Sequence, residues 1–210
     1  MKAKEFDLSK EIIFEPDKGL TTFRNSRLVI FDVNAIGLLR QHLIEKLGKA
    51  QARDFFLQFG YQHGFGDFMQ MKQNYKFDNE MDLQASGPVI HSWEGLVQAT
   101  PRRISFNRNS GDFYFTGVWN NSWEAEQHLS FMDPEVQVFD EEPVCWTLMG
   151  YASGWCTAFF GRPLLAIEPI CVGCGDGICE WLIKPPRDWG EEARPYIAAL
   201  RDLWSKFHPR

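Results

Sequence analysis

The segment from Glu142 to Trp181 constrains the fold most, because it contains all five cysteines of the chain. Three of them, Cys171, Cys174 and Cys179, lie within nine residues and are interspersed with glycines. Glycine lets the backbone turn sharply enough to direct several thiolates at one point, so this spacing indicates a metal-binding turn. Cys145 lies upstream in a predicted helix, and a shared metal would tie that helix to a hairpin.

The residues alone leave the ligand set open. Spacing favours zinc bound by four cysteines, namely Cys145, Cys171, Cys174 and Cys179. Glu168, three residues before Cys171, is a rival ligand, because carboxylate oxygen also binds Zn²⁺. The structural alternative is a set of buried free thiols. Disulfides are not expected, since the charged N-terminus shows no apolar export segment and the cysteine count is odd.

Composition indicates one large domain or two small ones with a sizeable aromatic core. The chain has 210 residues, of which 44% are hydrophobic, with 18 Phe and 8 Trp. A net charge of −6 and the lack of a basic run argue against nucleic-acid binding by this chain. The longest uncharged stretch, 143–161, contains small and polar residues typical of a buried helix rather than a membrane span. We therefore expect a cytoplasmic protein with no membrane contact.

Hydrophobic periodicity predicts an α+β fold of mixed helices and antiparallel strands, with a zinc-stapled helix and hairpin in the C-terminal half. Helices are predicted over 34–48, 49–75, 80–95, 122–130, the segment holding Cys145, and 191–207. Strands are predicted over 12–14, 27–33, 164–167, 179–183 and on both sides of a turn at 109–112 within 103–119. An acidic loop is expected over 133–142, and Gly60 and Gly64 are expected to loosen the second helix.

Several sequence motifs resemble the sensor domain of the XylR/DmpR group, which are sigma-54-dependent transcriptional activators of aromatic catabolism. They are EPVCWTLMGYASG, EPICVGCGDGIC, FFLQFGYQHG at 55–64 and GPVIHSWEG at 87–95. The first two correspond to the 4-vinyl-reductase-type subdomain of that group, and the resemblance covers about 27–189. It implies that zinc is bound by Cys145, Glu168, Cys171 and Cys179, with Cys174 lining the turn.

The resemblance also implies an aromatic effector held by His91 and Trp119. In phenol-responsive members, a His and a Trp at these relative positions hold the ligand hydroxyl. Members that respond to toluene or xylene tend to carry Tyr in place of this His. Neutral imidazole offers one donor and one acceptor and indole offers a donor, so the pair suits a hydroxyl inside an apolar cavity. A phenol or related hydroxylated aromatic is therefore the expected effector.

Other aromatic residues are candidates for the pocket wall, although plain core is the favoured role of each: Trp93, Phe113, Phe115, Tyr151 and Phe159. Relatives often carry bulky side chains where this chain has Gly117 and Ala166, so these residues are expected to open space that a ligand larger than phenol could fill. Trp155, where relatives often have Tyr, is expected to take some of that space back.

We divide the chain into 1–95, a helical and dimerisation region, 96–189, the ligand- and zinc-binding subdomain, and 190–210, a signalling helix. A homodimer is expected from the resemblance. The chain lacks a GxxxxGKS/T motif, so we expect an excised sensor whose ATPase domain is absent. The alternatives are a lipid- or tetrapyrrole-binding module and a zinc-dependent enzyme. A site filled with thiolates argues against the enzyme, because catalytic zinc keeps an open position.

Overall fold

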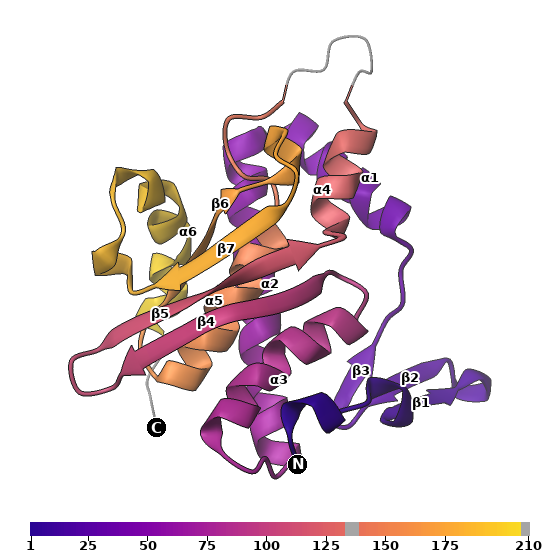
Figure 1. Cartoon of the computed structure of the whole chain (residues 1–210). Helices are drawn as coiled ribbons and strands as arrows, with labels where there is room; N and C mark the ends of the chain where they lie inside the picture. The colour runs from indigo at the N-terminus through magenta and orange to yellow at the C-terminus, as the bar shows by residue number, and fades with distance from the viewer. Residues whose placement is uncertain (133–138, 207–210) are drawn as a thin grey trace.

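The computed structural model describes residues 1–132 and 139–206, and its centre is an antiparallel sheet covered on one face by helices (Figure 1). The strand order is β4-β5-β7-β6. The strands span Gln98–Asn107 (β4), Asp112–Asn120 (β5), Leu165–Ile170 (β6) and Cys179–Lys184 (β7). The predicted α+β class is confirmed. Both hairpins follow the predicted turns, with the second one enclosing the cysteine-rich segment.

The described part of the chain has six α-helices, and Figure 1 shows α2 and α5 running behind the sheet. They span Val33–Leu47 (α1), Lys49–Asn74 (α2), Glu80–Trp93 (α3), Trp123–Ser130 (α4), Trp146–Phe160 (α5) and Arg194–Ser205 (α6). None of the described helices is both long enough and apolar enough to cross a membrane. The segment 143–161 is instead the most buried helix of the core, since all but two residues of α5 are buried.

Local capping explains where the predicted helices begin and end. The Asp32 carboxylate accepts the backbone N–H of Ala35 at the start of α1, and the Ser122 hydroxyl accepts that of Ala125 at the start of α4. Gly48 ends α1 with a positive φ of 84°, a conformation that favours glycine, and α2 follows at once. The last helix begins later than predicted, because Glu191–Ala193 forms a separate 3-10 turn. Of the predicted acidic loop, 133–138 lies outside the described residues.

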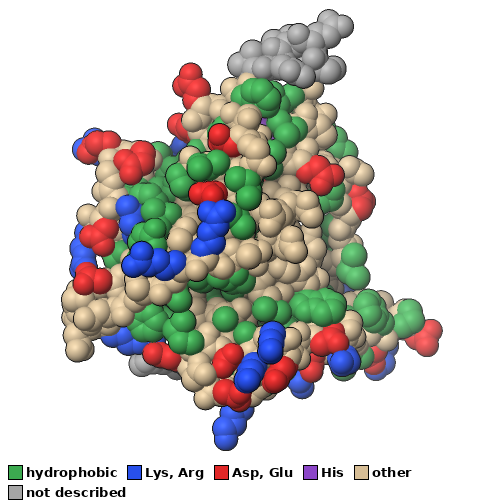
Figure 2. Space-filling view, in the orientation of Figure 1, with side chains coloured by type: hydrophobic (Ala, Val, Ile, Leu, Met, Phe, Trp, Pro, Cys, Tyr) green, Lys and Arg blue, Asp and Glu red, His purple; other side chains and the backbone are tan. Residues whose placement is uncertain are grey.

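A small N-terminal sheet forms a separate layer beside the end of α2. It contains β1 (Ile12–Glu15), β2 (Leu20–Phe23) and β3 (Ser26–Leu28). The strand predicted over 27–33 ends early, since its last pair is Leu28 with Thr21. The segment 29–31 is left exposed, and Figure 2 shows further hydrophobic side chains over this sheet.

Glycines bring the backbones of α2 and α5 into direct contact. A Cβ atom at Gly60 or Gly64 would overlap a backbone carbonyl of α5, and one at Gly150 or Gly154 would overlap a carbonyl of α2. The expectation that Gly60 and Gly64 loosen α2 is therefore wrong. These residues remove the side chains that would hold the two helices apart.

The close approach predicts opposite effects for two Gly→Ala substitutions. Gly154→Ala places a methyl group against the Tyr61 carbonyl, so we expect the free energy of unfolding to fall by about 1–3 kcal/mol. Gly66→Ala on α2 meets open space, and we expect a gain of up to about 1 kcal/mol from helix propensity. Urea unfolding followed by circular dichroism measures both values. Equal effects of the two substitutions would contradict the close packing.

Candidate functional site

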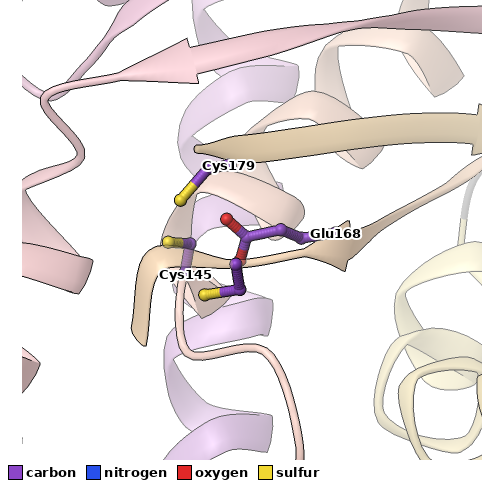
Figure 3. Close-up of side chains that lie close together, drawn as sticks. Cys145, Glu168 and Cys179 are labelled. Carbon is purple, nitrogen blue, oxygen red and sulfur yellow. The ribbon is translucent and has the colours of Figure 1, made fainter. Parts of the chain in front are cut away.

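Three cysteine thiols and one carboxyl group converge where the turn of the second hairpin meets the start of α5. Figure 3 labels three of these residues, Cys145, Glu168 and Cys179. Cys145 is the residue that precedes α5, Glu168 lies on β6, Cys171 follows β6 and Cys179 begins β7. Their ligand atoms all lie within 4.8 Å of one another, and each residue is at most 1% exposed. This buried group can hold a metal ion. It is the set that the resemblance implies, whereas Cys174 lies outside it on the turn.

The chemistry of these four side chains fits a cation. Neither carboxylate oxygen of Glu168 has a hydrogen-bond partner among the described residues. Burial raises the pKa of both the Glu168 carboxyl and the Cys145 thiol, and their acidic neighbours add to this effect. Hydrogen bonds from the Cys145 and Cys179 thiols lower the pKa of Cys171. Bound there, a positive ion would stabilise the charged forms of these crowded acids, which burial otherwise disfavours.

Backbone hydrogen bonds shape the turn that presents Cys171. Its N–H donates to the Asp176 carboxylate at 2.9 Å, and its carbonyl accepts the N–H groups of Cys174 and Asp176. Gly175 has a φ of 93°, which glycine tolerates and which reverses the chain toward β7. Gly175 therefore serves the turn, as predicted from the sequence.

A second feature is a cavity of about 30 Å³ enclosed between α3, α5 and the sheet. Five of the nine predicted ligand-binding residues line it: His91, Phe115, Trp119, Tyr151 and Trp155. Other residues that line the cavity were not predicted from the sequence, among them Gly87, Pro88, Cys156, Trp181 and Ile183. The alternation of apolar residues along β7 places Trp181 and Ile183 on the inner face of the sheet, and this signal could have identified them.

The other four predicted residues lie elsewhere. Trp93 is 46% exposed on the outer side of α3, and Phe159 packs against Phe68 and Phe106. Gly117 does not widen the cavity, because the indole of Trp181 covers it. Ala166 is fully buried and is not among the residues that line the cavity, and its N–H donates to the Ser153 hydroxyl.

Three nitrogen atoms of the cavity wall are buried without a hydrogen-bond partner among the described residues. They are Nε2 of His91 and Nε1 of Trp155 and of Trp181. Burial lowers the pKa of His91 to about 4, so its imidazole is neutral at physiological pH. Each unpaired buried polar group costs about 1–3 kcal/mol. A polar ligand group that reaches these atoms would therefore gain hydrogen bonds that the protein itself does not make.

Stacked rings fix the orientation of the His91 imidazole. Its ring lies parallel to that of Tyr151, with the centroids 4.0 Å apart, and Tyr151 in turn stacks at 6.2 Å on Trp155. The Tyr151 hydroxyl donates to the Asp67 carboxylate at 3.0 Å, which anchors the middle ring. The imidazole is thus held by α5 and α2 although it belongs to α3.

The cavity is too small to hold an aromatic ring. A volume of about 30 Å³ exceeds the space that one water molecule needs, while a cavity of about 150 Å³ is known to bind benzene. An aromatic ligand therefore requires side chains of the wall to move outward.

Comparisons with known proteins identify a matching family and similar regulators. The model of the family described as "Activator of aromatic catabolism" (XylR_N) matches residues 7–107. The phenol regulator MopR of Acinetobacter guillouiae is 31% identical over 183 residues, which is 87% of this chain and 32% of MopR. The transcriptional regulatory protein XylR of Pseudomonas putida is 30% identical over 188 residues, or 88% of this chain and 32% of XylR. The chain thus spans about a third of the length of these curated relatives.

A solved structure extends the likeness to the whole fold. The phenol-responsive sensory domain of the transcription activator PoxR, crystallised with phenol, superposes with a TM-score of 0.81 at 29% identity. The match covers 91% of this chain and 92% of that domain. The fold is that of a regulatory sensor domain. The chain belongs to the family of XylR-type N-terminal aromatic-sensor domains.

The low pKa of His91 predicts a pH dependence of stability. Between pH 6.5 and 4 the unfolded chain binds a proton at His91 and the folded protein does not, so stability falls as the pH falls through this window. From pH 7 to pH 5 we expect His91 to account for a loss of about 2 kcal/mol. His91→Phe, which cannot titrate, should lose that much less than the wild type in urea unfolding at the two pH values. Parallel losses in both proteins would show that His91 is not buried in its neutral form.

Proposed function

We propose that this chain is the ligand-sensing domain of a transcriptional activator and that it binds phenol or a related hydroxylated aromatic in the cavity. The observation that carries the proposal is an aromatic-walled cavity with unpaired nitrogen atoms on His91, Trp155 and Trp181. The phenol-responsive domain of PoxR supports it through a shared fold. A hydrocarbon such as toluene would leave all these atoms unpaired, whereas a hydroxyl can both donate and accept.

The cavity residues suggest how binding would be signalled. The ligand ring would lie among Phe115, Trp119 and Tyr151, with its hydroxyl directed at His91 and an indole N–H. Because the cavity is too small for a ring, binding favours a conformation in which side chains of its wall have moved outward. A ligand moves such an equilibrium only by its difference in affinity for the two states. The domains that would receive the signal lie outside this chain, and the expected homodimer stays a prediction from the resemblance.

Titration calorimetry with phenol and toluene tests the proposed function. We expect phenol to bind the wild type at micromolar concentration and toluene at least tenfold more weakly, because toluene leaves buried nitrogen atoms unpaired. His91→Ala should weaken phenol binding about tenfold or more. Trp93→Ala, on the outer side of the same helix, is the matched control and should bind phenol like the wild type. Equal binding of phenol and toluene would refute recognition of the hydroxyl.

We also propose that the metal is zinc, held by Cys145, Glu168, Cys171 and Cys179. Three thiolates and a carboxylate make a four-ligand set that zinc accepts in closed structural sites. Bound there, zinc would supply a cross-link between the start of α5 and both strands of the second hairpin. A set that fills all four positions disfavours the alternative of a zinc-dependent enzyme, since catalytic zinc retains a position for water.

Two serine substitutions distinguish the two ligand sets. Cys179→Ser removes a buried member of the group, so we expect loss of most bound zinc and a lower melting temperature. Cys174→Ser changes a residue outside the group and should keep about one zinc per chain with little change in melting temperature. Metal analysis by mass spectrometry and thermal unfolding measure both effects. Loss of zinc from Cys174→Ser alone would favour the all-cysteine set.

A further inference from the structure

A cluster of titratable side chains lies against the ring of Tyr151 without lining the cavity. His63 and Asp67 are one turn apart on α2, and Glu94 is the residue that follows α3. The His63 Nε2 atom lies 3.3 Å from a carboxyl oxygen of Asp67 and 3.6 Å from one of Glu94. The cluster therefore joins α2 to the end of α3, one turn after His91.

The cluster carries no net charge at neutral pH. Burial opposes a charge on His63, but the nearby Glu94 and Asp67 carboxyl groups raise its pKa to about 9, so its imidazole is protonated. Burial and the Glu94 charge raise the pKa of Asp67 to about 8, so its carboxyl group is neutral. Glu94 stays charged, because the neighbouring His63 outweighs burial and lowers its pKa. The charges of His63 and Glu94 therefore balance.

Tyr151 connects this cluster to the cavity. Burial raises the pKa of its hydroxyl well above the usual range, so the hydroxyl keeps its proton and donates it to Asp67 at 3.0 Å. The rings of Tyr151 and His63 meet edge to face, with centroids 5.2 Å apart. The Tyr151 ring also stacks on the His91 imidazole, at 4.0 Å between centroids and 5° between planes. The ring that orients His91 is thus held from outside the cavity.

The direction of the His91 Nε2 atom bears on which ligands the cavity prefers. This atom is buried without a partner among the described residues, and a hydrogen bond to it weakens steeply when its angle departs from linear. Burial of a hydrocarbon ring is not directional in this way. A looser stack on His91 would therefore harm the recognition of a hydroxyl more than the binding of a hydrocarbon.

We infer that Asp67 is a positioning residue that acts through Tyr151 to orient the His91 imidazole, and that it thereby sets the preference for phenol over toluene. This inference rests on the proposed function, because it takes the hydroxyl of the effector to pair with His91. Asp67 is not among the residues that line the cavity, so its effect on the ligand is indirect.

Titration calorimetry of the zinc-loaded protein with phenol and with toluene measures this preference. Asp67→Ala removes the acceptor of the Tyr151 hydroxyl, so we expect phenol to bind about fivefold more weakly and toluene to stay within about twofold of the wild type. Asp67→Asn should restore the preference, because its amide is neutral and can accept the same proton. Asp54→Ala, also on α2 and not lining the cavity, is the control and should bind both ligands like the wild type.

Tyr151→Phe tests the same hydrogen bond from its other side and leaves the three residues of the cluster intact, so it decides the question if Asp67→Ala does not fold. We expect the same selective loss of phenol binding. The double variant should bind phenol no more weakly than either single variant, because both changes remove one interaction.

The outcomes separate this inference from the proposed function. If phenol binds the wild type but Asp67→Ala changes phenol and toluene binding equally, or changes neither, Asp67 does not position His91 and the inference fails alone. Additive losses in the double variant would contradict action through Tyr151. If phenol does not bind the folded wild type, the proposed function fails and this inference fails with it.

Discussion

The backbone contact between α2 and α5 is the constraint on which the rest of this structure depends. Glycines at the crossing let each helix approach the carbonyl groups of the other, and this places α5 in the middle of the molecule. Every functional feature then involves α5. Its first turn follows Cys145, and its middle presents Tyr151, Trp155 and Cys156 to the cavity. A shift of this one helix would be felt at both buried sites.

The two sites have different physical characters. The buried group of three cysteines and Glu168 is acidic throughout and could hold a metal ion. The cavity is apolar and aromatic, with a few neutral polar atoms whose partners are missing from the protein. A metal ion in the first group would fix the start of α5 against the hairpin, while the cavity leaves nitrogen atoms of α3, α5 and β7 without partners among the described residues. A ligand bound in this cavity would pair the free nitrogen atoms and so complete the core.

Much of this arrangement could be predicted from the sequence, and the failures have physical causes. Periodicity and capping residues identified the helices and hairpins, and the motif around Cys171 identified the turn that contributes to the buried group of cysteines and Glu168. Spacing alone chose Cys174 over Glu168, because proximity along the chain does not reveal which side chain a turn directs inward. Gly117 was expected to widen the cavity, but its free space is taken by Trp181 from the neighbouring strand. Contacts between strands far apart in sequence decide such cases.

Nuclear magnetic resonance of the indole N–H groups tests the central claim most directly, since the chain has eight Trp residues in distinct surroundings. The account predicts that phenol shifts the signals of the buried indoles of Trp155 and Trp181. The signal of Trp93, exposed on the outer side of α3, should stay unchanged. A shift at Trp93 with unchanged signals from the buried pair would place the ligand on the surface and contradict the account.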